Sequence, residues 1–255
     1  MSGGGAKNAG LTILWLWPDI LNLHGDRGNV MALARICGLY GIEANIVRVS
    51  RLGDDFDVGG ADMAVLGSGE LAALPGVTAA LSKRLAELKA WTESGGVLLA
   101  TGTTGAALGT STARTDGSHL QGLGLLDMEC RERKTVLGDD LIFRAGRHTI
   151  YGIQIQMMDV SLAAGQAPFG ETVYGFGNDG KGGEGAAKNG IIFTNALGPL
   201  LVKNPWLTIE LINRALARRE PPHPPLSFDP NLFETELASA KAIEKFNETK
   251  KRPPK

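Results

Sequence analysis

Polar side chains crowd one short loop of this 255-residue chain, between residues 17 and 29. Asp19, Asn22, Asp26, Arg27 and Asn29 bring two carboxylates, two amides and a guanidinium into it. Such groups can contact a ligand or a partner, and they can equally cap a helix or pin a loop by local hydrogen bonds. Because the two uses are compatible, we keep both interpretations open.

A second candidate is the turn at residues 101–105, Thr-Gly-Thr-Thr-Gly, which follows a short apolar run. A strand that ends in a sharp, glycine-assisted turn into a helix exposes one side chain at the helix N-terminus, where the helix dipole favours an anion. A threonine hydroxyl needs a base to become a nucleophile, and His119, His148 and His223 are isolated in the sequence. We therefore do not expect a threonine nucleophile here.

The other polar patterns in the sequence are weaker indications of a functional site. The glycine-rich residues 175–183 only superficially resemble a phosphate loop, because a glycine follows Lys181 and a strand is predicted next. Cysteine and histidine do not cluster, so we expect no metal and no cofactor. The carboxylates at positions 54 and 55, and at 139 and 140, are interpreted as solvated turns.

The composition indicates a globular protein. Apolar residues make up 43% of the chain, and 26 basic residues nearly balance 27 acidic ones, so there is no electrostatic signature of nucleic-acid or anionic-membrane binding. No apolar run approaches the roughly 18 residues of a membrane span. The N-terminal residues lack the apolar core of a signal peptide, so we expect a cytoplasmic protein. Cys37 and Cys130 form no CxxC pair and are expected to be buried, unpaired thiols.

The candidate loops must be positioned by the first half of the chain, where strands and helices alternate. Strands are expected at residues 11–17, 43–49, 62–66 and 96–100, and helices from Asn29 to about 40 and from 77 to 94. This alternation predicts an α/β fold with an open, mostly parallel sheet and helices on both faces. Ligands bind such sheets at the carboxyl ends of the strands, so the loops 17–29, 67–70 and 101–105 are expected to share one edge.

The second half has a different pattern. Short alternating runs separated by glycine-rich turns between residues 128 and 194 predict β-hairpins and a mixed sheet. Asn204 and Pro205 are expected to begin a helix, with Asn204 as its cap. We expect residues 1–10 to be disordered, residues 11–220 to form the main domain, and residues 221–255 to form a proline-rich linker followed by a helix from about 229 to 247.

Several motifs together resemble a known family. Residues 17–29, WPDILNLHGDRGN, resemble the opening motif of the GatD-type, CobB/CobQ-like class I glutamine amidotransferases, and GLGLLD at 122–127 resembles the family's GLGILD. Residues 174–189, which include Asn178 and Asn189, resemble its GxGNN…G…KN, and GPLLVKNP at 198–205 resembles its GPLLPKNP. The matches run in order over roughly residues 11–218. The resemblance implies a class I glutamine amidotransferase-like, flavodoxin-like fold.

The chain departs from that family where the family's chemistry is done. The family's nucleophile is a cysteine in a CGGYQ elbow, and its base is a histidine before the GP of GPLLPKNP. The cysteine position falls here on Thr101 or Gly102, and the histidine position on Leu197. The loop at 67–71 and the segment at 152–157 also differ, and an arginine expected near 134–136 is missing. Glutamine hydrolysis needs a thiolate and an imidazole, so the resemblance with these losses implies an inactive glutaminase without catalytic residues.

We therefore expect a non-catalytic member of this family. The resemblance implies a heterodimer with a MurT-like Mur ligase that amidates the peptidoglycan precursor lipid II. The five loop residues, with Asn178 and Asn189, are then candidates for contacting a ligand or the partner. Two alternatives remain open: an active amidotransferase subunit with a relocated nucleophile, and a sensor module that binds a small molecule in the altered pocket.

Overall fold

The computed structural model describes residues 10–249, and within them the strands form two sheets. The first sheet has the strand order β11-β12-β4-β3-β1-β2. Its strands are β1 (Leu11–Leu16), β2 (Ala44–Val49), β3 (Met63–Leu66), β4 (Val97–Thr101), β11 (Ala186–Lys188) and β12 (Ile191–Thr194). All neighbours are parallel except β11, which is antiparallel to β12. The predicted mostly parallel sheet is confirmed. The expected disordered N-terminus lies, apart from Gly10, outside the described residues.

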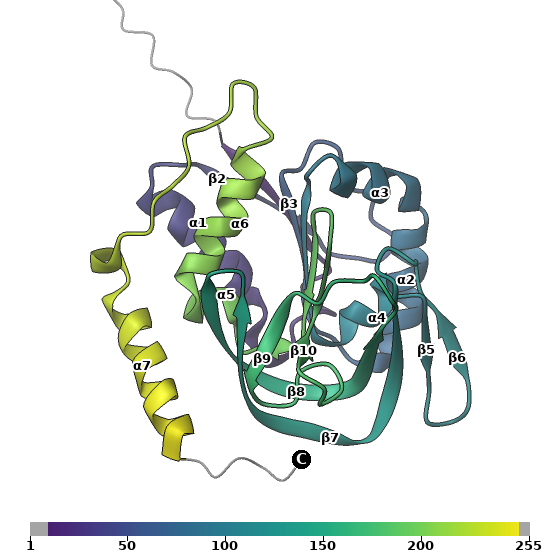
Figure 1. Ribbon diagram of the computed structural model, residues 1–255. Coiled ribbons are helices and arrows are strands. Elements are labelled where there is room, and N and C mark those ends of the chain that lie inside the picture. The colour runs from purple at the N-terminus through teal and green to yellow at the C-terminus, as the bar shows by residue number, and fades with distance from the viewer. Residues whose placement is uncertain (1–9, 250–255) are drawn as a thin grey trace, which may run out of the picture.

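Side chains of this sheet alternate between two apolar cores, because successive residues of a strand point to opposite faces. Leu11 and Ile13 of β1 join one core, while Leu14 and Leu16 join the other. The first core contains α1 (Arg27–Leu39) and α6 (Pro205–Leu216), and the second contains α2 (Leu74–Ser82), α3 (Leu85–Glu93) and α4 (Gly105–Leu108). Figure 1 shows α1 and α6 on one side of the sheet and α2 and α3 on the other. Helices therefore cover both faces, as predicted.

The prediction of one continuous helix at residues 77–94 is wrong, because the structure has two separate helices there, α2 and α3. The break falls at Lys83 and Arg84, where Arg84 leaves the helical region with φ −122° and ψ 20°. The guanidinium of Arg84 forms ion pairs with Asp55 and Glu87 and lies 5.4 Å from the centre of the Phe56 ring. Both helices bury apolar residues against the same core, so their shared periodicity concealed the break.

The second sheet is built on a long hairpin of β7 (Met128–Ala145) and β8 (His148–Leu162). The remaining strands are β5 (Ser111–Ala113), β6 (His119–Gln121), β9 (Gly170–Tyr174), β10 (Gly183–Glu184) and β13 (Ala196–Leu197). In this sheet β5 and β7 are parallel, and all the other neighbouring strands are antiparallel. The predicted mixed sheet of hairpins is therefore confirmed. Asp139 and Asp140, expected in a turn, lie within β7.

The two sheets meet at Asn195. Strand β12 ends at Thr194 in the first sheet, and after one residue the chain enters β13, which pairs with Ile153 and Gln154 of β8. This short connection brings the carboxyl edge of the parallel sheet against the middle of β8. Any site at that edge is consequently closed on one side by the second sheet.

The C-terminal part packs back onto the domain. After α5 (Leu200–Lys203), α6 begins at Pro205 as predicted, but the Asn204 side chain does not cap it. Its amide instead accepts from Tyr151 N and donates to the Tyr151 and Leu200 carbonyls, at 2.8–2.9 Å. Beyond the proline-rich linker, a 3₁₀ helix (Pro230–Leu232) precedes α7 (Glu234–Thr249). Within residues 10–249, no helix has the length and apolar character needed to cross a membrane.

Candidate functional site

The elbow after β4 has glycine at its apex. Gly102 adopts a left-handed backbone with φ +58°, whereas Thr101 is still extended and fully buried. A side chain at position 102 would project from this turn, which has the strand-to-helix geometry of nucleophile elbows. A Cβ built there would lie 2.5 Å from Ser68 Oγ and 3.1 Å from Leu197 Cδ2. A side chain at position 102 would therefore require Ser68 Oγ to move and would lie against Leu197.

The backbone N–H groups around the elbow are also occupied. In elbow sites, the N–H after the nucleophile and one from a neighbouring loop stabilise the oxyanion of the reaction. Here Thr103 N donates to Ser68 Oγ at 3.4 Å, and Gly69 N donates to Thr103 Oγ1 at 3.0 Å. The Thr103 hydroxyl in turn donates to Gly69 O at 2.5 Å. Side-chain hydroxyls thus take the places where a substrate oxygen would bind.

Little room remains above the elbow. The cavity at this point has a volume of about 10 Å³ and is lined by Gly102, Thr103, residues 155–158 and Asn195. A volume of roughly 10–15 Å³ holds a single water molecule. A glutamine side chain does not fit without displacement of the surrounding residues.

Asp26 is the buried hub beneath the elbow. Its carboxylate accepts hydrogen bonds from Ser68 N, from Thr101 Oγ1 at 2.9 Å and from Asn29 Nδ2 at 3.2 Å. Asn29 Oδ1 accepts from Leu201 N at 2.8 Å. Burial raises the pKa of Asp26 to about 6, although these hydrogen bonds act to lower it. Asp26 and Asn29 therefore connect the carboxyl ends of β3 and β4 with α5, and the predicted meeting of the three loops at one edge is confirmed.

The other candidates in the first loop lie at the surface. Asp19 forms an ion pair with Arg48 at 2.6 Å, and Asn22 Oδ1 accepts from Arg27 N at 2.9 Å, at the start of α1. The Arg27 guanidinium is exposed, and it makes no hydrogen bond or ion pair with residues 10–249. The loop thus combines two buried structural residues with three solvent-facing ones.

A second network of buried hydrogen bonds lies where the two sheets meet. Asn178 Oδ1 accepts from Gly185 N and Asn195 Nδ2, at 2.8 and 2.9 Å. Glu184 is fully buried, and its carboxyl accepts from Thr194 Oγ1 and from Asn195 N. Burial raises the pKa of Glu184. These bonds fix Asn178 within the fold, so its amide is not turned toward a ligand.

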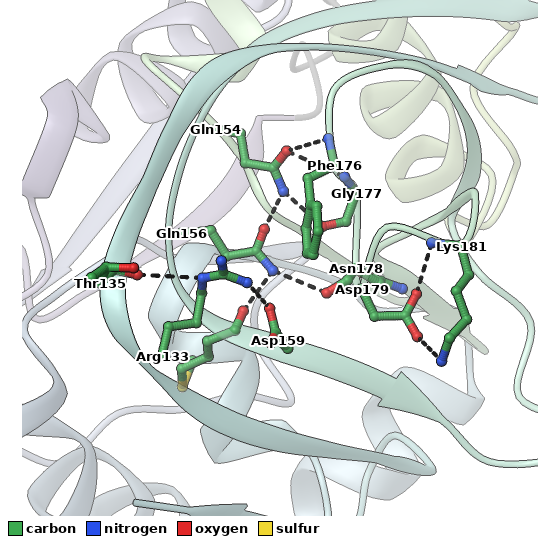
Figure 2. A network of polar contacts seen from close by, with 11 residues as sticks. Arg133, Thr135, Gln154, Gln156, Asp159, Phe176, Gly177, Asn178, Asp179 and Lys181 are labelled. Atoms are coloured by element: carbon green, nitrogen blue, oxygen red, sulfur yellow. Dashed lines mark hydrogen bonds and ion pairs between the residues drawn. The ribbon is translucent and has the colours of Figure 1, made fainter. Parts of the chain in front are cut away.

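Gln154 and Gln156 extend this network from β8. Figure 2 shows the two side chains hydrogen-bonded to each other and directed at the segment that contains Phe176, Gly177 and Asn178. Sequence reasoning missed the roles of Gln154, Gln156, Ser68, Thr103 and Glu184. A signal existed for Ser68, because it lies in the loop at 67–71, which departs from the family's pattern, but its partner Thr103 is revealed only by the tertiary structure.

Asn189 belongs to a different part of the molecule. It is exposed, with φ +53°, in the turn between β11 and β12. That turn precedes the first residue of β12, whereas the elbow lies beyond the last residues of the parallel strands. The structure therefore does not bring Asn189 together with the other candidates.

The cysteines, the histidines and the candidate metal ligands do not provide a catalytic group next to Gly102. Burial raises the pKa of Cys37 to about 11 and that of Cys130 to about 12, so both buried thiols stay protonated at neutral pH. Among residues 10–249, no histidine hydrogen-bonds to Ser68, Thr101 or Thr103. In the described part of the chain, no group of three His, Cys, Asp or Glu residues could hold a metal ion.

Comparison with known proteins gives consistent relatives, although no protein-family model matches the chain. The chain is 30% identical over 228 residues to the lipid II isoglutaminyl synthase (glutamine-hydrolyzing) subunit GatD of Staphylococcus aureus, covering 86% of this chain and 90% of that protein. It is 28% identical over 213 residues to the subunit of the same name from Streptococcus pneumoniae, covering 82% of each. A crystal structure of a glutamine amidotransferase superposes with a TM-score of 0.54 at 17% identity, covering 81% of this chain and 99% of that one, which shows a shared fold.

Proposed function

The chain belongs to the family of GatD subunits of lipid II isoglutaminyl synthase, and from this premise we propose that it acts as a non-catalytic subunit of such an enzyme. One observation carries the proposal. The apex of the elbow is Gly102, and a Cβ at this position would lie 2.5 Å from Ser68 Oγ and 3.1 Å from Leu197 Cδ2. A glycine has no atom with which to form an acyl-enzyme.

The loss involves every component that glutamine hydrolysis requires. Position 197 carries a buried leucine, which cannot transfer a proton. The candidate oxyanion donors, Thr103 N and Gly69 N, are bonded to hydroxyls of the protein itself. Removing one oxyanion donor alone typically costs about 10²–10³-fold in kcat. Restoring a single component would therefore leave the others missing.

A relocated nucleophile is the first alternative. Thr101 Oγ1 donates to Asp26, and burial raises the pKa of that carboxyl to about 6, which suits a general base. However, Thr101 is 0% and Asp26 2% exposed, so no substrate reaches the pair. Ser68 is likewise only 2% exposed. The geometry does not favour this alternative, and the volume of about 10 Å³ above Gly102 does not favour a sensor that binds in the same pocket.

We propose a MurT-like Mur ligase as the partner, in a heterodimer. The relatives are named as subunits of a glutamine-hydrolysing synthase, so a partner subunit is part of their function. A ligase that uses free ammonia would need this chain for stabilisation or regulation, and both require a surface and no elbow chemistry. The exposed side chains of Asp19 and Arg27 lie on the loop that the family motif marks, and they are available for such a contact.

The test is a glutaminase assay on the purified chain, alone and with a co-expressed Mur-ligase-like partner, with the S. aureus GatD enzyme as positive control. We expect no glutamate release above background in either state, and co-elution of the two chains in size-exclusion chromatography. Glutamate release that an alkylating thiol reagent abolishes would refute the non-catalytic role. Failure of the two chains to co-elute would refute the proposed partner, and leave the non-catalytic role to be judged by the assay alone.

A further inference from the structure

Basic and apolar side chains alternate along the outer side of α1. Four exposed residues follow one another there at intervals of four and therefore lie on one side of the helix, Arg27, Met31, Arg35 and Leu39. We call this row the outer stripe of α1. Met31, at 63%, is the most exposed large apolar side chain in the described part of the chain. The opposite side of α1 already packs on the sheet, so the folding of this chain does not account for the exposed apolar residues.

The arginines of the outer stripe have no acidic neighbour on their own helix. α1 contains no Asp or Glu, and the residue four positions after each arginine, where a glutamate would pair with it, is apolar. The Arg27 guanidinium makes no hydrogen bond or ion pair with residues 10–249. A cation in the first turn of a helix is also disfavoured by the helix dipole. The N-terminal half of the stripe thus carries a positive charge that α1 does not compensate.

The C-terminal half of the stripe already contacts another helix of this chain, and that contact shows which groups the stripe can bind. Arg35 Nη1 pairs with Glu236 Oε1 of α7 at 3.1 Å. The same guanidinium lies 5.9 Å from the centre of the ring of Phe233, which is buried immediately before α7. An arginine of the stripe therefore binds a carboxylate and an apolar side chain that stand three residues apart on one segment.

α5 adds a further apolar side chain to the uncovered half of the stripe. A Cβ at Gly28 would lie 2.5 Å from Pro199 Cγ and 3.5 Å from Val202 Cγ2, so the glycine allows this segment to approach α1 closely. Gly28 and Met31 are three residues apart and are neighbours on the helix surface, which places Val202, 42% exposed, beside the turn that carries Met31. Arg27, Met31 and Val202 thus form one surface, which we call the α1–α5 patch.

We propose that the α1–α5 patch receives a helix of the ligase subunit on which a carboxylate and an apolar side chain stand three or four residues apart. The carboxylate pairs with Arg27 and the apolar side chain packs against Met31 and Val202, as Glu236 and Phe233 do at Arg35. This inference rests on the heterodimer proposed above and adds the chemistry of the contact.

Two other occupants match the patch less well. In a symmetric dimer the same patch of both copies would face itself, and two Arg27 side chains would repel each other. An anionic membrane surface is typically bound by clusters of about four to eight basic residues, whereas the patch has one arginine. Charge complementarity therefore favours an acidic helix of a different protein.

The apolar half of the patch is tested by the Kd of the complex between this chain and the ligase subunit, measured by biolayer interferometry. Met31→Glu places a carboxylate between the apolar side chains and is expected to raise Kd about 30-fold or more, as replacements of central interface residues do. Val202→Glu is expected to raise Kd about tenfold or more. The matched control Val136→Glu, at a 58% exposed position of β7, leaves Kd unchanged. Urea unfolding of each variant verifies that weaker binding does not come from a loss of folding.

The charged half of the patch is tested by salt. The Kd of the wild-type complex is expected to rise between about 0.05 and 0.5 M NaCl, because salt screens an exposed ion pair. In Arg27→Gln, Kd should be about tenfold higher at low salt and should rise less with added salt. A wild-type Kd that does not change with salt would overturn the assignment of a carboxylate to Arg27.

The outcomes separate this inference from the function on which it rests. Absence of a wild-type complex would refute the proposed partner and the patch together. A wild-type complex whose Kd is the same with Met31→Glu and Val202→Glu would refute the patch alone. Self-association of the chain, or its binding to vesicles of anionic phospholipid, would also overturn the assignment if Met31→Glu abolished it, because the patch would then have a different occupant.

Discussion

At the scale of single residues, the elbow is sealed by small polar groups rather than by bulk. Ser68 Oγ accepts a hydrogen bond from Thr103 N, and Thr103 Oγ1 accepts one from Gly69 N and donates one to Gly69 O. Each hydroxyl therefore bonds to the backbone of the other residue's loop. An unpaired buried N–H costs about 1–3 kcal/mol, so these two hydroxyls stabilise the fold beside Gly102.

Rebuilding the dyad alone is expected to fail. The double variant Gly102→Cys with Leu197→His should show no glutamate release, because the new Cβ would meet Ser68 Oγ at 2.5 Å and the oxyanion donors stay occupied. A non-glycine residue at φ +58° also costs about 1–2 kcal/mol, which urea unfolding measures. The matched variant adds Ser68→Gly and Thr103→Gly, which frees the donors. Activity in the double variant that alkylation abolishes would contradict the sealed-elbow explanation.

Asp26 predicts a specific pH dependence of stability. Its folded-state pKa of about 6 lies above the ordinary pKa of 3.8 for an aspartate side chain, so the folded state binds the proton more tightly than the unfolded state. The corresponding stabilisation is complete below the unfolded pKa and is lost as the pH rises through about 6. The stability advantage of the wild-type protein over Asp26→Asn should accordingly be roughly 1 kcal/mol larger at pH 5 than at pH 7, measured by urea unfolding. A difference that does not change with pH would contradict the assigned pKa.

At the scale of elements, the sequence predicted the type of most elements better than their limits. The continuous apolar run of β4 and the apolar stripe of α6 are local properties of the sequence, so their patterns revealed them. The break at Arg84 and the length of β7 depend on partners far away in the sequence, Asp55 for the former and the whole of β8 for the latter. Asn204 is a further example. Its position correctly predicted the start of the helix, but its side chain forms hydrogen bonds with the backbone of Tyr151 instead of capping the helix.

The C-terminal helix is expected to be an integral element rather than an appendage. Phe233 is fully buried at its start and stacks on Phe228, with ring centres 5.3 Å apart. Phe233→Ala should lower the free energy of unfolding by about 3–5 kcal/mol, the usual cost of deleting a buried aromatic ring. Its neighbour Leu232, 38% exposed, provides the control, and Leu232→Ala should cost less than about 1 kcal/mol. Similar losses for the two variants would mean that α7 is loosely attached.

At the scale of the whole molecule, family, fold and the lack of a catalytic cysteine and histidine were predictable from the sequence, whereas the residue at the apex of the elbow was not. Motifs in order along the chain carry the fold, because they mark turns that the sheet requires. Whether the cysteine position is Thr101 or Gly102 depends on backbone geometry, and only the left-handed φ of Gly102 identifies the apex. The first loop is a second example, because the burial of its residues could not be read from the sequence. Asp26 is buried between the three loops, whereas its neighbour Arg27 is exposed to solvent.

Because Asp26 is buried and Arg27 is exposed, variants at these two positions can distinguish effects on folding from effects on assembly. Asp26 holds the ends of β3 and β4 together, so its replacement should lower stability, while the exposed Arg27 side chain has no partner in the described part of the chain. Arg27→Ala should therefore change the free energy of unfolding by less than about 0.5 kcal/mol. If the loop forms the contact with the ligase subunit, the same variant should weaken that complex about tenfold or more, as arginines at interface centres do. Arg131→Ala, at an exposed position of β7, is the matched control, and equal affinities for the two variants would place the partner elsewhere on the molecule.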